Sequence, residues 1–323
     1  MRKFFGRNWF LFGIALALIL GFAIPEVGIA VNRDSIASTT LIVLLFLISG
    51  LKLPTESILK GISQIRLHLY VQGFIFVLVP IYFFATARFF GSALNGTLLI
   101  GFYALAALPT TVSSCIIFTQ SAEGNVVGTM FNAALANAVG VFLSPIILSL
   151  MLRSAGGGLP ISELTAVLGG LALKMLLPIA VGQFVRRYAR DWIDGHKKPL
   201  SVTSNIFVLT ILHFAFAKTA ANPEIVQSID ELVLPFLYLA ASHIILIGAA
   251  FGGAKILKFD RADRVTVLFA APQKTLAMGV PLLSTFFGAE SVILGPALLP
   301  LIFYHAWQLL VAGIVVRMVG TKT

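Results

Sequence analysis

Charged residues are scarce in this chain, and their scarcity decides its class. Only 11% of its 323 residues are Asp, Glu, Lys or Arg, whereas 58% are hydrophobic. Soluble globular domains have roughly 25% charged residues, so a soluble fold of this size would lack the polar surface it needs. The composition predicts an all-α polytopic membrane protein, because helices that cross a bilayer are long and apolar.

Acidic residues are the rarer charged group, and none of them falls in the middle of an apolar segment. The 13 Asp and Glu residues stand against 23 Lys and Arg residues, which gives a formal net charge of +10. A buried carboxylate that could bind a cation or relay a proton is therefore missing from the predicted spans.

The basic residues gather on one side of the predicted topology. With the amino terminus inside, only Arg33, Arg88, Arg153 and Lys218 fall in exterior segments. This asymmetry follows the positive-inside rule and places both termini in the cytoplasm. We interpret the charge as topogenic, with the lipid bilayer and not nucleic acid as the partner, and expect a bacterial inner (plasma) membrane protein.

Cysteine and the common catalytic motifs are nearly absent. Cys115 is the only cysteine, so no internal disulfide can form. The sequence contains no phosphate-binding Gly-Lys-Ser/Thr loop, no His-Glu-x-x-His motif and no cysteine-histidine metal cluster. We therefore expect neither an enzyme nor a resident cofactor.

Apolar segments dominate what is present, and ten of them are predicted to cross the bilayer. The predicted spans are residues 9–24, 35–51, 69–87, 97–120, 125–152, 162–185, 201–219, 232–256, 265–287 and 291–319. Five spans precede the glycine-rich linker 154–160, and five follow it. An odd number per half reverses the orientation of the second half, so 1–153 and 161–323 are predicted to be two inverted five-helix repeats.

The fourth and ninth predicted spans are broken by proline and polar residues. Pro109 begins a run rich in hydroxyls that ends at Ser114, and Pro272 precedes Gln-Lys-Thr at 273–275. Such groups cannot face lipid, where each unpaired polar group costs several kcal/mol. Two broken spans in corresponding places indicate a transporter binding site. The alternative, that the hydroxyls only cap backbone groups freed by the break, stays open.

Lys274 is the most unusual residue of the ninth span. A lysine there is either neutral, or charged and paired with an anion, with helix carbonyls or with a dipole. Beside Pro272, its ammonium could point at carbonyls freed by the break and take the place of a metal cation. It either locks the broken helices together or acts in substrate binding or coupling. Lys174, in the sixth span, could pair, snorkel or line a cavity.

Other polar side chains within the spans complete the candidate site. A lone intramembrane glutamine such as Gln72 more often joins helices than binds a ligand. A single histidine such as His305 can titrate near neutral pH but is more often a hydrogen-bonding core residue. The predicted substrate- or ion-binding residues are Ser113, Ser114, Thr129, Asn132, Gln273, Lys274, Thr275, Gln72 and His305.

Three strings, at 109–114, 128–145 and 272–279, resemble the bile acid:sodium symporter family over nearly the whole chain. The segment 273–281 and the pair Tyr304-His305 are most similar to that family's orphan seventh-type branch and its bacterial relatives. The resemblance implies a panel domain from spans 1, 2, 6 and 7 and a core domain from spans 3–5 and 8–10. It also implies that the fourth and ninth helices cross at the site.

The resemblance also implies a reduced set of sodium ligands, namely Ser114, Thr129 and Gln273. Two changed positions concern the ninth span, where Phe269 replaces the family's glutamate and Lys274 replaces an asparagine. Two more concern the fourth and fifth spans, where Cys115 replaces an asparagine and Ala133 replaces a hydroxyl residue. These changes put two-sodium coupling in doubt.

Three functions follow as hypotheses. The first is an alternating-access secondary transporter of a small or amphipathic organic anion, in which Lys274 supplies the charge that sodium provides in relatives. The second is a sodium-coupled organic anion symporter that uses Ser114, Thr129 and Gln273. The third is a non-transporting membrane regulator whose polar breaks are relics. The sequence leaves open the substrate and whether the coupling ion is sodium, a proton or none.

Overall fold

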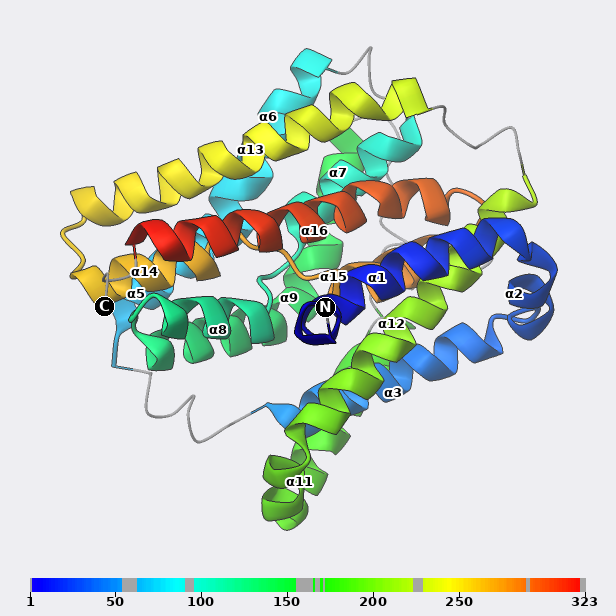
Figure 1. Cartoon of the computed structure of the whole chain (residues 1–323), viewed down its shortest axis with the longest axis horizontal. Helices are drawn as coiled ribbons and strands as arrows, with labels where there is room; N and C mark the ends of the chain where they lie inside the picture. The colour runs from blue at the N-terminus through cyan, green and yellow to red at the C-terminus, as the bar shows by residue number, and fades with distance from the viewer. Residues whose placement is uncertain are drawn as a thin grey trace. The chain divides into compact units, whose positions relative to one another are not determined.

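The computed structural model describes residues 2–53, 63–90, 96–154, 165, 169–170, 172–222, 229–288 and 291–319, and their regular structure is entirely helical. The predicted linker 154–160 lies outside this part except for Ser154. The helices are α1 (Arg2–Ala23), α2 (Pro25–Val31), α3 (Ile36–Lys52), α5 (Ile65–Gly73), the π-helical turn η1 (Phe74–Leu78), α6 (Val79–Phe90), α7 (Gly96–Ala107), α8 (Ser113–Ser121), α9 (Val126–Ser154), the π-helical turn η2 (Ala172–Leu176), α11 (Leu177–Gly195), α12 (Lys197–Ala220), α13 (Ile229–Ile256), α14 (Arg261–Ala270), α15 (Leu276–Phe287) and α16 (Leu294–Val319) (Figure 1).

In the part of the chain that the structure describes, five continuous helices are long and apolar enough to cross a membrane. They are Ile65–Ala87, Val126–Ser154, Lys197–Ala220, Glu231–Ile256 and Leu294–Val319. A sixth span exists if α1 and α2, which meet at a bend of 96°, are counted together. The all-helical class is thus confirmed in the described residues, which hold five or six candidate membrane spans, whereas the ten-span inverted repeat stays a prediction.

The segment from Pro25 to Asp34, which lies between the first two predicted spans, is helical for most of its length. It forms the helix α2, with Pro25 in its first turn. Proline is favoured at the start of a helix, because its fixed φ suits the helix and its missing N–H would have no partner there.

The chain divides into two compact units, each of which takes residues from both halves of the sequence. One unit comprises Met1–Leu53, Pro160–Gln227 and Val280–Leu299. The other comprises Pro54–Leu159, Ser228–Gly279 and Pro300–Thr323. We call them the first and the second unit. The panel and core domains implied by the family resemblance stay predictions.

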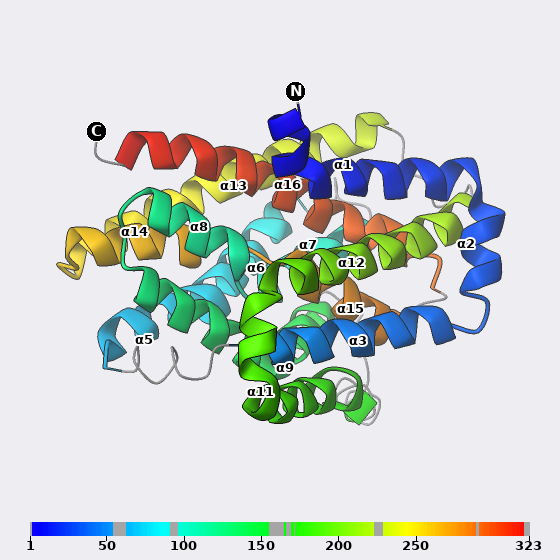
Figure 2. The same ribbon diagram turned by 60° about the horizontal axis from the view of Figure 1, so that its bottom comes forward.

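In the first unit, α3 packs against α11 and α12, and α1 packs along α12 (Figure 2). Glycines allow the closest approach, which is where α3 meets α11. A Cβ atom at Gly182 would overlap the backbone oxygen of Leu47, and one at Gly50 would overlap the backbone of Ile179. Small residues at such crossings let helix backbones approach within a membrane.

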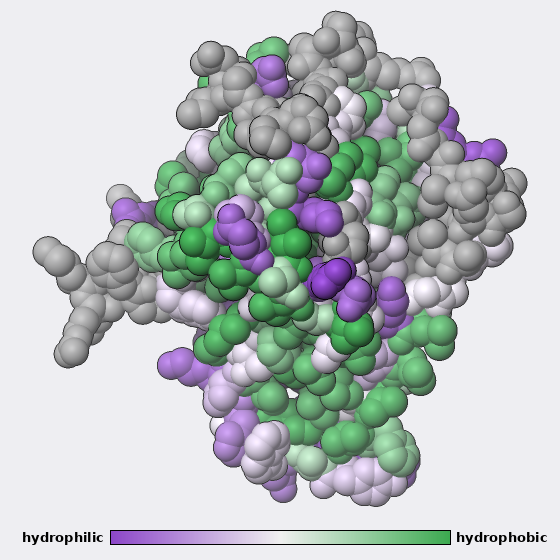
Figure 3. Space-filling model, turned by 90° about the vertical axis from the view of Figure 1, so that its right-hand side faces the viewer, coloured by the Kyte–Doolittle hydropathy of each residue, from purple (hydrophilic) through white to green (hydrophobic). Residues whose placement is uncertain are grey.

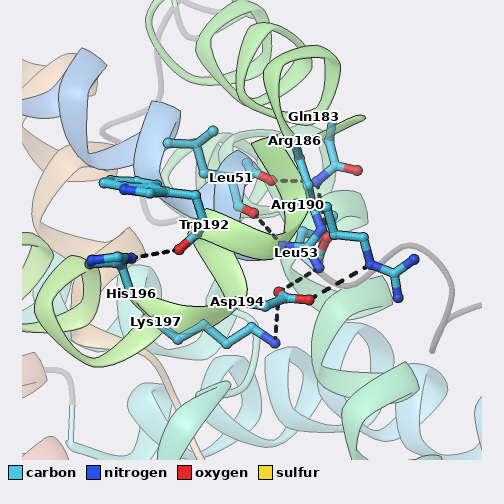
Figure 4. Close-up of polar contacts among 10 residues, drawn as sticks. Leu51, Leu53, Gln183, Arg186, Arg190, Trp192, Asp194, His196 and Lys197 are labelled. Atoms are coloured by element: carbon cyan, nitrogen blue, oxygen red, sulfur yellow. Dashed lines mark hydrogen bonds and ion pairs between the residues drawn. The ribbon is translucent and has the colours of Figure 1, made fainter. Parts of the chain in front are cut away.

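The carboxyl end of α3 is capped by side chains of α11. Gln183 donates hydrogen bonds to the carbonyl oxygens of Gly50 and Leu53. Arg186 donates one to Leu51 O at 3.0 Å and another to Asp194 Oδ1 at 2.8 Å (Figure 4). The last carbonyls of a helix have no partner within it, so α11 both packs against α3 and satisfies its end.

In the second unit, helices α7, α8 and α14 contact α9, and α13 packs against α14. The interior includes Phe83, Phe102 and Tyr238, whose rings form edge-to-face and stacked pairs. Tyr82 donates a hydrogen bond to Ser242 at 3.0 Å and so joins α6 to α13.

The surface is also apolar. Hydrophobic side chains cover much of the face shown in Figure 3. In the first unit, Ile19 and Ile36 are 59% and 69% exposed. Single exposed apolar residues occur in all proteins, but their number here fits a surface that faces lipid.

We expect Gly182→Ala to lower the thermal midpoint of unfolding, because its methyl group would force the backbones of α3 and α11 apart. Overpacking of this kind costs about 1–3 kcal/mol. Gly248→Ala is the matched control, since no atom lies within 4 Å of a Cβ placed at Gly248. Equal midpoints for the two variants would contradict the close crossing.

Asp194 gives the first unit a pH-dependent contribution to stability. The hydrogen bond from Arg186, followed by that from Lys197, lowers the pKa of the Asp194 carboxyl below its usual value of about 3.9. A carboxyl with a lower pKa when folded stabilises the fold above its unfolded pKa, and the gain is lost as the pH falls through the folded pKa. We therefore expect the thermal midpoint to fall below about pH 4 and Asp194→Asn to reduce that fall. Asp191→Asn serves as control, and an unchanged acid response in Asp194→Asn would refute the assignment.

Candidate functional site

The two helix breaks are in direct contact within the second unit. Residues 108–112 separate α7 from α8, and 271–275 separate α14 from α15. The backbone N–H of Thr275 donates a hydrogen bond to Pro109 O at 3.0 Å. Breaks at both predicted places are therefore confirmed. The unwound backbone of one break forms a hydrogen bond with that of the other, because backbone polar groups within a membrane need partners in the protein.

Lys274 lies at the centre of this contact and is 1% exposed. Its Nζ donates hydrogen bonds to Leu108 O at 2.7 Å, Ala106 O at 3.2 Å and Ile75 O at 3.3 Å. An ammonium has three donors and no acceptor, so three carbonyl oxygens use all of them.

The position of Lys274 also suits its charge. Ala106 and Leu108 lie at the carboxyl end of α7 (Gly96–Ala107), where the aligned peptide dipoles leave a partial negative charge. A cation is stabilised there even without an acidic partner. The two carbonyls lie at the first break and the cation lies in the second, so Lys274 joins the two breaks.

Two residues of α16, Gln308 and Tyr304, hold the backbone of the second break. Gln308 Oε1 accepts a hydrogen bond from the N–H of Lys274, and Gln308 Nε2 donates one to Lys274 O, both at 2.8 Å. One turn earlier, the hydroxyl of Tyr304 donates to Pro272 O at 2.8 Å. Sequence reasoning missed this clamp. The sequence does contain a signal for the clamp. Tyr304 and Gln308 are polar residues four positions apart in an apolar span, and this spacing places them on one helix face.

The side chain of Gln273 points to the first break. Its Oε1 accepts a hydrogen bond from Thr111 Oγ1 at 2.7 Å, and Ser114 Oγ lies 3.1 Å from the same oxygen. Ser114 Oγ also donates to Thr111 Oγ1 at 2.6 Å. Gln273 and Ser114, both predicted site residues, are thus brought together, and Thr111 joins them.

Thr129 is placed elsewhere in the second unit. Its Oγ1 lies 3.1 Å from Thr119 Oγ1 and 3.0 Å from Thr266 Oγ1. Ser114 bonds to Thr111 and Gln273, whereas Thr129 bonds to Thr119, Thr266 and the backbone of Asn125. The hydroxyls thus form two groups of hydrogen bonds, and sodium binding by Ser114, Thr129 and Gln273 stays a prediction.

Three of the four replaced ligand positions share a different environment. Cys115, Ala133 and Phe269 belong to one buried hydrophobic cluster that also contains Leu268 and Ala312. Apolar side chains offer no oxygen to a cation that prefers oxygen ligands. The part of the second unit where the family resemblance would put further ligands is therefore filled with hydrocarbon.

The remaining predicted residues have separate roles. Gln72 Nε2 donates to Asn132 O at 3.1 Å and to Asn132 Oδ1 at 3.2 Å, so this pair joins helices. Ser113 is exposed at the first position of α8, and the side chain of Thr275 is buried. His305 Nδ1 lies 3.1 Å from Gln308 Nε2 and so supports the clamp.

Comparison with known proteins places the chain in a family. A model of the SBF-like CPA transporter family matches residues 8–321. The chain belongs to this family. It is 29% identical over 317 residues to sodium/bile acid cotransporter 7 of Rattus norvegicus, a match that covers 96% of this chain and 92% of the relative. Over the same length it is 30% identical to sodium/bile acid cotransporter 7-A of Xenopus laevis, which covers 96% and 91%.

A bacterial protein is also similar to this chain. YfeH of Escherichia coli (strain K12), whose name proposes that it is a symporter, is 31% identical over 288 residues, which covers 88% of this chain and 85% of the relative. The resemblance read from the two breaks is thus confirmed. This SBF-like CPA transporter family member is an integral membrane protein of a secondary transporter family.

We expect Gln308→Leu to destabilise this SBF-like CPA transporter family member by about 2–4 kcal/mol, because it leaves a buried N–H and a buried C=O of Lys274 unpaired. Gln120→Leu is the matched control, since Gln120 is exposed at the end of α8. The thermal midpoint in one detergent measures both variants. A midpoint for Gln308→Leu equal to that of the parent protein would show that the clamp is dispensable.

Proposed function

We propose that the protein is an alternating-access secondary transporter of a small or amphipathic organic anion, built from ten spans as two inverted five-helix repeats. The observation that carries the proposal is the contact of two broken helices within one unit, joined by a buried lysine. Unwound helices that meet in mid-membrane are the usual place for a transporter to bind substrate and coupling ion.

An anion suits the helix ends at this place. Helices α8 and α15 begin directly after the two breaks, at Ser113 and Leu276. The amino end of a helix carries a partial positive charge and free N–H groups, which favour an anion. Val112 and Ser113 are exposed, so the amino end of α8 is accessible to a ligand. Two relatives are named sodium/bile acid cotransporters, which supports an amphipathic organic anion as substrate.

In this proposal the Lys274 ammonium replaces the coupling sodium ion. The ammonium donates hydrogen bonds to carbonyl oxygens at the carboxyl end of α7. A bound cation would be stabilised at the same place. Three positions that supply ligands in the family's pattern are apolar in this chain and packed together. A cation that is covalently part of the protein cannot be carried across the membrane, so sodium would no longer drive transport.

One observation favours the rival function, sodium-coupled symport through a reduced site. The oxygens of Gln273, Thr111 and Ser114 lie within 2.6–3.1 Å of one another. Oxygen is the ligand that hard cations prefer, so these three groups could hold an ion if the hydroxyls turned. A test must therefore separate sodium dependence from the role of Lys274.

We expect the thermal midpoint of the purified protein to be the same in sodium, potassium and choline chloride. A ligand that binds only the folded state stabilises it by RT ln(1 + [L]/Kd), which is about 1.4 kcal/mol at ten times Kd. A midpoint raised by sodium alone would support symport and contradict the role given to Lys274.

Uptake of a radiolabelled bile acid into proteoliposomes gives the second prediction of this proposal. We expect uptake without a sodium gradient and a loss of at least about tenfold in Lys274→Gln, which keeps hydrogen-bond donors but removes the charge. Lys174→Gln, another lysine in the membrane region, is the matched control. Full uptake by Lys274→Gln would overturn the substitution of sodium by lysine. A folded parent protein that transports none of a panel of organic anions would favour the regulator over the transporter.

A further inference from the structure

We propose that the turn between α11 and α12 binds the headgroup of an anionic phospholipid. The turn lies in the first unit, and none of its residues contributes to the site at the helix breaks. Its basic and aromatic side chains together fit a lipid whose phosphate lies at the membrane surface and whose chains lie below it.

The turn carries an excess of positive charge. Asp194 is shared by Arg186 at 2.8 Å, Lys197 at 3.0 Å and Arg190 at 3.7 Å. Arg187 and Lys198 are exposed in the same segment. Five basic residues between 186 and 198 thus stand against two acidic ones. Because one carboxylate is shared by three cations, the site is left positive and complements a phosphate.

Aromatic side chains give the same place an apolar part. Phe184, Tyr188 and Trp192 of α11 are 64%, 73% and 58% exposed. They continue the exposed apolar residues Leu177 and Val181 toward the end of the helix. Exposed tyrosine and tryptophan at the end of a lipid-facing helix are typical of the membrane–water interface. The surface is therefore continuous with the lipid-facing side of α11, which favours lipid over an acidic protein segment as its occupant.

The turn carries both kinds of side chain within a few residues of one another. The helix is kinked at Ala189, whose φ and ψ are −116° and 24°. After the kink, Trp192 stacks on His196 with ring centroids 4.4 Å apart. In Figure 4 this stack lies on one side of the turn, and Asp194 with its basic partners lies on the other.

Arg186 fixes the turn before any lipid arrives. It is buried, and it holds both Leu51 O of α3 and Asp194. Asp194 in turn positions Lys197 and Arg190. A guanidinium binds phosphate oxygens through two parallel hydrogen bonds, so Arg187 and Arg190 are the principal headgroup contacts.

The test uses the quenching of Trp192 by lipids with brominated chains, in the full-length protein. The chain has three tryptophans, so Trp9→Phe and Trp307→Phe leave Trp192 as the only reporter. We expect brominated phosphatidylglycerol to quench Trp192 more strongly than brominated phosphatidylcholine at equal mole fraction in phosphatidylcholine vesicles. In Arg187→Gln/Arg190→Gln the preference for phosphatidylglycerol should fall by about thirtyfold, because each basic residue lost lowers it by about fivefold.

Lys258→Gln/Arg317→Gln is the matched control, because it removes two basic residues elsewhere and should keep the preference. If Arg187→Gln/Arg190→Gln does not fold, Lys197→Gln/Lys198→Gln replaces it with the same expected direction. Equal quenching by the two lipids in the parent protein overturns the proposal. So does a preference that survives both double substitutions, or one that soluble polyglutamate abolishes, since the last result would assign the turn to an acidic protein segment.

Discussion

The hydrogen bonds from the Lys274 ammonium to the carbonyls of Ile75, Ala106 and Leu108 are the contacts on which the rest of the second unit depends. A helix that stops in mid-membrane leaves carbonyl oxygens that neither water nor lipid can satisfy. The chain supplies protein donors instead. Asn137 donates to Thr110 O, and Tyr304 and Gln308 donate to Pro272 O and Lys274 O. These hydrogen bonds give the freed carbonyls of Ala106, Leu108, Thr110, Pro272 and Lys274 partners within the protein.

This constraint explains why a lysine can occupy the position. Burial of an isolated ammonium is expensive, but a buried cation is tolerated when its donors are all used and a helix dipole opposes its charge. The carboxyl end of α7 provides both conditions. The same features would stabilise a bound sodium ion, so a lysine and a sodium ion are alternative solutions to one electrostatic problem. The apolar packing of Cys115, Ala133 and Phe269 supports our proposal that lysine takes the place of sodium in this chain.

Sequence patterns predicted the places of the breaks well, because proline and polar residues within an apolar span leave few structural alternatives. Sequence patterns predicted less well which residues contact the breaks. A pairing of Lys274 with freed carbonyls was one of the alternatives left open, yet nothing in its neighbourhood indicates Ile75, which lies 199 residues away. Gln308 was missed for the same reason, since its partner is a backbone 34 residues earlier. Thr129 and Gln72 match the family by position, but the distances that decide whether they meet Gln273 exist only in the folded chain. The helix α2 lies between two predicted spans and was not predicted, although proline is favoured at the start of a helix.

The two units satisfy their polar groups in different ways, and this difference bears on how a transporter of this kind could work. The first unit holds α3 and α11 together by a close glycine crossing and by Arg186, which caps a helix end. The second unit pairs polar groups in the middle of its helices. In both cases the partners come from within the same unit. A change in the arrangement of one unit against the other would leave the bonds of Lys274, Gln308 and Arg186 intact. In the transporter that we propose, alternating access by motion of whole units would therefore keep these hydrogen bonds.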